Sequence, residues 1–131
     1  MKDFDSWNKE KKSLENIGHD ILSFHEREIW WCSIGINLGD EQDGKNELFE
    51  RPVLILKKYS KDMCFVLPLT TQIKNPKPWY QVIVKIEEEI NAVNISQGRV
   101  ISSKRLLRKI IVLDTADYNA VINSFIKSFN N

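Results

Sequence analysis

The sequence predicts a mainly β domain with flanking helices, in which a small, strongly curved antiparallel sheet or part-open barrel is closed by a C-terminal helix. Five or six short segments, most of them consecutive, are rich in β-branched and aromatic residues, as strands are. No helical pattern separates the central segments, so nothing is available to cover a parallel sheet. With 131 residues, 42% of them hydrophobic and 28% charged, the chain has the composition of one ordinary globular domain.

The first 25 residues are expected to form an N-terminal amphipathic helical extension. Apolar side chains recur at helical spacing from Ser6 to Phe24, with charged residues between them. Asp5 or Ser6 can serve as the N-cap, and Gly18 indicates a bend or an early end to the helix. The main domain is therefore expected over residues 26–131.

Strands are expected over residues 28–36, 52–57, 63–69, 80–86, around 92–96 and 109–113. A long polar loop is expected between the first two, and the segment 99–109 is interpreted as a turn or short helix. Asp114 is expected to cap the closing helix. The apolar stripe of that helix consists of Tyr118, Val121, Ile122, Phe125 and Phe129.

Cysteine, histidine and hydropathy patterns argue against a disulfide-bonded, metal-binding, secreted or membrane-spanning protein. Cys32 and Cys64 lie in apolar segments, where free thiols are more typical than a disulfide. No Cys/His cluster has metal-ligand spacing, so neither a metal nor another cofactor is expected. The start of the chain is acidic, unlike a signal peptide, and the longest uncharged run, Met63–Ile73, is shorter than the roughly 20 residues of a spanning helix. We expect a cytoplasmic protein without membrane contact.

The net charge of +1 hides a polarised chain. Residues 1–50 hold 6 basic and 12 acidic side chains, a balance of −6, whereas residues 51–131 hold 13 basic and 6 acidic, a balance of +7. The basic part can face an anionic polymer, or folding can bring the two parts together and cancel the field.

The informative motifs are four short blocks in order along the chain. Common nucleotide-binding, serine hydrolase and metalloprotease signatures are absent. The blocks are Glu28-Ile29-Trp30-Trp31; Gly39-Asp40-Glu41-Gln42-Asp43-Gly44 with Arg51-Pro52-Val53-Leu54-Ile55-Leu56; Val66-Leu67-Pro68-Leu69-Thr70-Thr71-Gln72; and Ser96-Gln97-Gly98-Arg99 with Lys104-Arg105-Leu106. Together they resemble the MazF/PemK toxin family over roughly residues 26–128. Asp40 stands where that pattern usually has serine, and four extra residues precede Arg51.

The resemblance implies an SH3-like, CcdB-type small barrel that forms a homodimer. It also implies the toxin of a type II toxin-antitoxin system, a metal-independent, sequence-specific endoribonuclease that cleaves single-stranded RNA and is inhibited by a cognate antitoxin protein. Two alternatives stay open, because a fold does not decide a function. One is a CcdB-like, non-enzymatic toxin that binds DNA gyrase, and the other is a catalytically silent RNA-binding relative.

Three residues of these blocks are expected to be catalytic. RNA is cut without metal when its own 2′-hydroxyl attacks the adjacent phosphorus, a step that requires stabilised phosphate charge and proton transfer. Arg51 offers a planar fork for two phosphate oxygens. Thr70 can hydrogen-bond a phosphate oxygen or orient the 2′-hydroxyl, although strand propensity explains it equally well. Glu41 can accept a proton or hold Arg51 in place.

RNA-binding positions are expected at Gln42, Gln72, Lys74, Lys77, Trp79, Gln97, Arg99 and Arg105. Trp79 lies beside two lysines on a proline-rich loop, a combination of stacking face and positive charge that single strands favour. Gln97 and Arg99 can also satisfy turn backbone groups, and Arg105 can belong to a solvated basic face. Trp30 and Trp31 are interpreted as core residues, and a catalytic pair of histidines is disfavoured.

Overall fold

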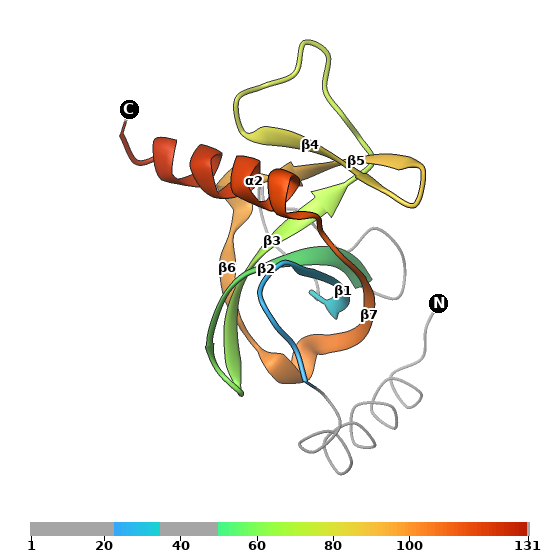
Figure 1. Ribbon diagram of the computed structural model, residues 1–131, viewed down its shortest axis with the longest axis vertical. Helices are drawn as coiled ribbons and strands as arrows, with labels where there is room; N and C mark the ends of the chain where they lie inside the picture. Colours follow the sequence, from blue (N-terminus) through green and yellow to red (C-terminus); the bar gives the residue numbers. More distant parts are fainter. Residues whose placement is uncertain (1–22, 35–49, 131) are drawn as a thin grey trace.

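The computed structural model describes residues 23–34 and 50–130 (Figure 1). The predicted N-terminal helix falls outside the described residues except at its end, and so do Glu41 and Gln42. In order, the elements are β1 (Glu28–Ser33), β2 (Glu50–Ser60), β3 (Met63–Thr70), β4 (Gln81–Ile86), β5 (Glu89–Asn94), the 3-10 turn η1 (Ile95–Gln97), β6 (Arg99–Ser102), the 3-10 turn η2 (Ser103–Arg105), β7 (Leu106–Val112) and helix α2 (Thr115–Lys127).

The seven strands form one antiparallel sheet in the order β4-β5-β3-β2-β1-β7, with β6 paired to β3. β6 and β7 are consecutive in the chain, yet they lie on opposite sides of the group β3-β2-β1. The sheet must therefore curl until its edges approach each other, and Figure 1 shows these strands arranged around a common interior. The predicted mainly β, barrel-like class with a C-terminal helix is confirmed.

Alternate residues of the central strands enter two different cores. The interior cluster consists of Phe24, Trp30, Cys32, Ile34, Val53, Ile55, Cys64, Val66, Ile101 and Leu106. The helix-side cluster contains Ile29, Leu54, Leu56, Leu67, Leu69, Val84, Val93, Leu113 and Val121, among others. Because both faces of β2 are covered, its sequence is a continuous apolar run rather than an alternating one.

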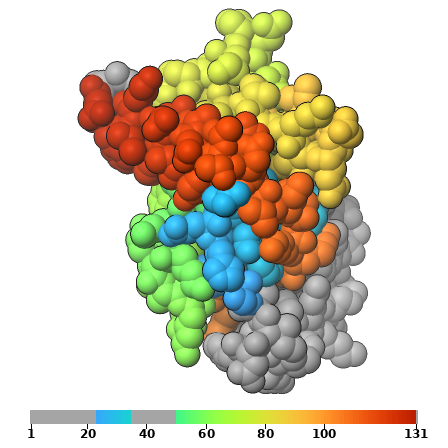
Figure 2. Space-filling model, viewed as in Figure 1, coloured from blue at the N-terminus to red at the C-terminus, as the bar shows by residue number. Residues whose placement is uncertain are grey.

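Helix α2 covers the helix-side cluster, as predicted. The Asp114 carboxylate accepts a hydrogen bond from the Asp117 backbone N–H at 2.8 Å and so caps the first turn. The Tyr118 hydroxyl donates to the Leu56 carbonyl at 2.7 Å, and Phe125 packs on Phe65 with ring centroids 5.5 Å apart. Figure 2 shows the helix lying against the β4–β5 region. Phe129, expected in the apolar stripe, lies beyond the helix end and is 73% exposed.

Two local expectations are wrong. Residues 99–109 form β6, η2 and the start of β7 rather than a turn or short helix. The reason is pairing: β6 is hydrogen-bonded to β3, and the Ser102 side chain caps a helical segment of only three residues. The strand expected around 92–96 begins at Glu89, because the tight hairpin after β4 lets pairing start at once.

The beginning of the described chain is anchored in the barrel. Phe24 is 1% exposed and belongs to the interior cluster, and the Lys58 ammonium lies 4.6 Å from the centre of its ring. Cys32 and Cys64 are both free and buried. Within residues 23–34 and 50–130, no helix is long and apolar enough to cross a membrane.

Candidate functional site

The pairing of β2 with β3 brings two predicted catalytic residues together. Val53 is opposite Pro68, and continuing this antiparallel register by two residues places Arg51 opposite Thr70. Side chains two residues apart in a strand share a face, so Arg51 points to the same side as Val53 of the interior cluster. Arg51 and Thr70 therefore meet at one open end of the barrel interior.

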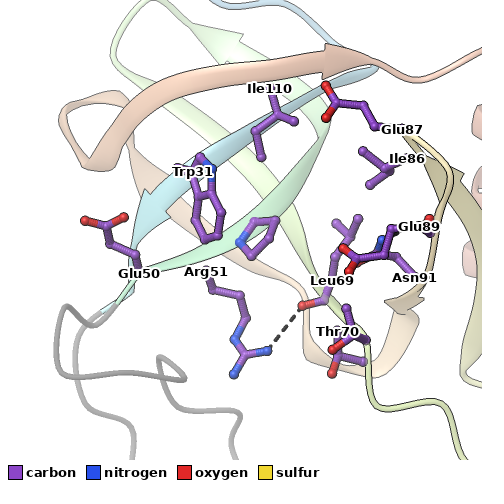
Figure 3. Close-up of a pocket in the computed structure, with 12 residues that line it drawn as sticks. Trp31, Glu50, Arg51, Leu69, Thr70, Ile86, Glu87, Glu89, Asn91 and Ile110 are labelled. Atoms are coloured by element: carbon purple, nitrogen blue, oxygen red, sulfur yellow. Dashed lines mark hydrogen bonds between the residues drawn. The ribbon is translucent and has the colours of Figure 1, made fainter.

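Arg51 is held rigidly for such a long side chain. Only 4% of the residue is exposed, and its Nη1 donates to the Leu69 carbonyl oxygen at 3.2 Å (Figure 3). Because a cation acts more strongly on a nearby anion when water is excluded, burial here increases its effect on a bound phosphate. The position can supply a fixed positive charge.

Thr70 ends β3 in a defined orientation. The residue is 7% exposed, and its Oγ1 accepts a hydrogen bond from the Gln72 backbone N–H at 3.0 Å. A hydroxyl that accepts a bond still has its own proton to donate. Thr70 can therefore donate to a phosphate oxygen beside Arg51.

Both residues line a cavity of about 560 Å³ between the barrel and the β4–β5 hairpin. The lining residues are Trp31, Glu50, Arg51, Pro52, Leu69, Thr70, Thr71, Ile86, Glu87, Glu89, Asn91 and Ile110. One rim is tied by Arg108, whose Nη1 lies 3.8 Å from the Glu50 carboxylate and whose guanidinium lies 5.2 Å from the centre of the Trp31 ring. Acids, aromatic surface and cations therefore meet around one space.

The hairpin that supplies two of these acids has an unusual backbone. Ile86 pairs with Glu89, which leaves Glu87 and Glu88 as a two-residue turn. Their φ angles are 48° and 71°, the left-handed region that such turns require and that Asn and Gly normally occupy. A side chain in this region costs roughly 1–2 kcal/mol. Glycine would adopt these φ angles at a lower conformational cost than the two glutamates that occupy the turn.

Arg99 and Arg105, both expected to bind RNA, lie on the same side of the barrel as Arg51. Arg99 pairs with Val66 of the interior cluster, and Arg105 donates to the Ser33 carbonyl oxygen at 3.2 Å. Burial raises the pKa of the Cys32 thiol to about 12, and the charges of Arg105 and Arg99 oppose this rise. Arg105 and Arg99 therefore lie near Cys32, which pairs with Arg51 in the register of β1 and β2.

Gln97 precedes this group in η1, on the same strand connection as Arg99. Gly98 between them has no room for a side chain, because a Cβ atom there would lie 2.3 Å from the Phe65 ring. Close packing against Phe65 thus favours glycine at the position between Gln97 and Arg99.

The loop between β3 and β4 carries the remaining predicted contacts and projects from the molecule beyond β4 (Figure 1). Trp79 is 63% exposed, and its ring and that of Tyr80 form a T-shaped pair with centroids 5.7 Å apart. The Lys74 ammonium donates to the Tyr80 hydroxyl at 2.7 Å, and that of Lys77 donates to the Gln81 carbonyl oxygen at 3.3 Å. The loop thus combines an exposed aromatic face with two lysines.

Gln81 holds this loop in shape, a role that the sequence pattern did not reveal. The residue is 2% exposed, its Oε1 accepts from the Lys74 backbone N–H at 3.1 Å, and its Nε2 donates to the Gln72 carbonyl at 3.2 Å. The same amide donates to Asn94 Oδ1 at 3.3 Å. Gln81 is the first residue of β4, and amide side chains are mostly exposed in proteins, so its burial is an exception.

Sequence reasoning also missed much of the cavity wall. Trp31 is half-buried and lines the cavity, whereas its neighbour Trp30 is 4% exposed in the interior cluster. The strand alternation of two adjacent tryptophans was the available signal. Glu87 and Glu89 lie between the strands expected over residues 80–86 and around 92–96, and they belong to none of the four motif blocks. Within the described residues, no group of three or more His, Cys, Asp or Glu side chains is placed to hold a metal.

Comparison with known proteins agrees with this architecture. The chain superimposes on MazF from Deinococcus radiodurans with a TM-score of 0.68 and 15% identity, covering 82% of this chain and 97% of that one. An endoribonuclease in complex with its cognate antitoxin from a mycobacterial species gives 0.64 and 12%, covering 82% and 96%. The toxin MazF-mt6 of Mycobacterium tuberculosis gives 0.61 and 20%, covering 79% and 97%. At these identities the likeness establishes the fold alone.

The sequence itself establishes the family. No protein of curated function matches the chain at a significant level. The profile of the PemK-like, MazF-like toxins of type II toxin-antitoxin systems, however, matches residues 25–129, which is most of the chain. The chain therefore belongs to the family of PemK-like, MazF-like toxins of type II toxin-antitoxin systems.

Proposed function

We propose that the protein is a metal-independent endoribonuclease that cleaves single-stranded RNA, acts as a homodimer and is held inactive by a cognate antitoxin. One observation carries the proposal: the buried Arg51 guanidinium and the Thr70 hydroxyl lie at the same end of paired strands and line one cavity. Family membership supports it. So does the likeness to a mycobacterial endoribonuclease solved with its antitoxin.

The proposed reaction uses the RNA as its own nucleophile. The 2′-oxygen bonds to the adjacent phosphorus, and the bond from phosphorus to the 5′-oxygen breaks, which leaves a 2′,3′-cyclic phosphate and a 5′-hydroxyl. Arg51 stabilises the negative charge that grows on the phosphate oxygens, and Thr70 donates a hydrogen bond to one of them. Glu41 accepts the proton of the 2′-hydroxyl, and the 5′-oxygen takes up a proton from solvent water as it leaves.

The other basic residues bind the RNA on either side of this centre. Arg99 and Arg105, on the same side of the barrel, contact neighbouring phosphates together with Gln97. Lys74, Lys77 and Trp79 extend the path along the projecting loop, with Gln42 and Gln72 completing the RNA contacts.

Cleavage of a defined single-stranded RNA in excess chelator tests the proposal. We expect cleavage to persist with EDTA and the products to carry 2′,3′-cyclic phosphate and 5′-hydroxyl ends. Activity that stops with EDTA and returns with Mg²⁺ would contradict the 2′-hydroxyl mechanism. If the protein cleaves no RNA but inhibits DNA gyrase, the non-enzymatic alternative is correct.

A further inference from the structure

The cavity beside Arg51 has a wall that phosphate binding does not explain. We propose that it holds one nucleobase of the RNA, next to the cleaved phosphate, and selects a base with an amino group on its Watson–Crick edge, guanine most strongly. The inference rests on the proposed function, since it takes RNA as the ligand. It assigns base selection to Glu87 and Glu89 of the β4–β5 hairpin.

The size and shape of the cavity suit a planar ring. Its volume of about 560 Å³ lies within the usual range for small-molecule sites. Trp31 and Ile110 stand on one side and the hairpin residues on the other, with Arg51 and Thr70 at one end (Figure 3). Base stacking on aromatic side chains is the common way in which single-stranded RNA is held. The Trp31 ring offers such a surface.

The glutamates that line the cavity indicate that a base of the RNA enters it, and not the phosphate backbone. Ionised carboxylates only accept hydrogen bonds, and they repel phosphate oxygens. Glu87 and Glu89 are therefore suited to the edge of a base and not to the backbone. Guanine presents two neighbouring donors, N1–H and the 2-amino group, to the two oxygens of one carboxylate. Uracil presents one N–H between two carbonyl oxygens, which the carboxylates would repel.

Positive charge at the other side of the cavity favours RNA over a basic peptide. Arg51 lies at one end, and Arg108 lies over the Trp31 ring and beside Glu50. An arginine-rich peptide would meet both cations on its way to the glutamates. A nucleotide matches both sides, because its phosphate and its base are separated by the sugar.

The turn also provides a matched control. Glu88 follows Glu87 directly, carries the same charge and also has a positive φ, but its side chain is 91% exposed and pairs with Lys85 at 3.4 Å. It does not line the cavity. Replacing Glu88 with glutamine therefore removes the same charge from the same hairpin without touching the proposed base.

The test compares Glu87→Gln, Glu89→Gln and Glu88→Gln with the unmodified protein. After the cleavage position is mapped on random-sequence RNA, four oligonucleotides that differ in one flanking base are compared at each neighbouring position. Single-turnover cleavage is measured on these RNAs. Binding is measured on copies with a 2′-O-methyl group at the cleaved nucleotide, which cannot react.

The unmodified protein should prefer an amino-bearing base at one position by about 5-fold to 150-fold, the range of a good carboxylate or amide pair with a base edge. Glu87→Gln or Glu89→Gln should reduce that preference toward parity and leave other positions unchanged, while Glu88→Gln keeps it. Replacing guanine there with inosine, which lacks the 2-amino group, should weaken binding.

Three results would overturn the inference: a preference for uracil at that position, a base preference that survives Glu87→Gln and Glu89→Gln, or no binding of RNA. Capture of a poly-arginine peptide that those two variants lose, with base preference unchanged, would assign the cavity to a basic protein segment instead. Failure of the proposed function is distinct. Carboxylate-dependent base preference in binding without cleavage would refute the nuclease and leave the base site standing.

Discussion

Two regions of the molecule that are proposed to meet RNA differ in how firmly they are held. At the barrel end, Arg51 and Thr70 are 4% and 7% exposed, and each is fixed by a hydrogen bond to or from the backbone of β3 or the residues that follow it. On the β3–β4 loop, Trp79 is 63% exposed, and its ring forms a T-shaped pair with that of Tyr80. The first region is part of the packed sheet, and the second is a loop that projects from it.

This difference matches what each task demands. Stabilising a transition state requires donors that are already in position, because a small displacement costs much of the rate. Binding a flexible strand tolerates mobile contacts, provided that they are numerous. Gln81 allows the loop to be ordered without being buried, since its amide ties the backbone and leaves Trp79 outside. Turnover and affinity should therefore respond to different residues.

The largest effect is expected from Arg51→Lys. Lysine keeps the charge but loses the planar fork that can hold two phosphate oxygens at once. Loss of one such stabilising donor costs on the order of 10²–10³ in rate. Single-turnover cleavage should fall by that factor, whereas RNA binding, shared among Arg99, Arg105 and the loop lysines, should change little.

Thr70→Val is measured in the same two assays and should have a weaker effect of the same kind. It should reduce turnover by a smaller factor, because it removes one neutral donor, whereas Arg51→Lys removes a fork of charge-assisted donors. If Arg51→Lys cleaves at a near-normal rate, the buried guanidinium is structural and the division between the two regions fails. Circular dichroism of both variants should show an unchanged fold.

Trp79→Ala should act on affinity and leave turnover intact. Stacking of a base on an aromatic side chain is worth about 1–3 kcal/mol, so RNA binding should weaken by about 5-fold to 150-fold. Cleavage at saturating RNA should match that of the unmodified protein. Tyr59→Ala provides the control, because Tyr59 is similarly exposed, at 55%, but lies at the end of β2 outside the proposed RNA contacts. Equal effects of both variants would remove the loop from RNA binding.

The elements that local sequence patterns specify were predictable, and those that depend on tertiary pairing were not. Strand periodicity predicted most of the strands, and the Asp114 cap with its apolar stripe predicted α2. Short-range patterns could not predict β6, since a four-residue strand exists only because β3 offers it a partner. Tertiary pairing overrides weak local preference at such positions.

The candidate site divides in the same way. Motif blocks indicated Arg51 and Thr70, and the pairing of β2 with β3 then placed them at the same end of the two strands. Glu87 and Glu89 carried no motif, because their role depends on a hairpin folding back toward β1 and β2. The burial of Gln81 was equally hidden, since it arises from loop hydrogen bonds that join residues up to 13 positions apart.

Asp114→Ala should lower the stability of the fold without affecting either of the two regions that are proposed to contact RNA. The change removes the hydrogen bond to the Asp117 N–H at the start of α2, and loss of such a cap costs about 0.5–2 kcal/mol of folding free energy. Urea denaturation should show this loss, while turnover and affinity per folded molecule stay constant. Asp62→Ala, an exposed carboxylate in the β2–β3 turn, should leave stability nearly unchanged. A loss of turnover in folded Asp114→Ala would show that α2 supports the site.

The smallest effect is expected from Glu28, which is buried like Arg51 but lies at the far end of β1. Its burial raises the pKa of the carboxyl, but hydrogen bonds from the Trp30 indole and the His25 backbone N–H, together with Lys109, hold that pKa below its usual value of 4.5. A carboxyl whose pKa is lower in the folded state stabilises the fold when it is ionised. This contribution is present above about pH 4.5 and is lost as the pH falls through the folded-state pKa.

Glu28→Gln should therefore lower the melting temperature at neutral pH, and the difference from the unmodified protein should shrink as the pH falls from about 6 to about 3. Thermal melts across this range measure it. Glu88→Gln, at a side chain that is 91% exposed, should change the melting temperature little at neutral pH. A constant difference would mean that Glu28 acts through packing alone. Because the residue lies outside the cavity, cleavage per folded molecule at neutral pH should stay unchanged, unlike that of Arg51→Lys.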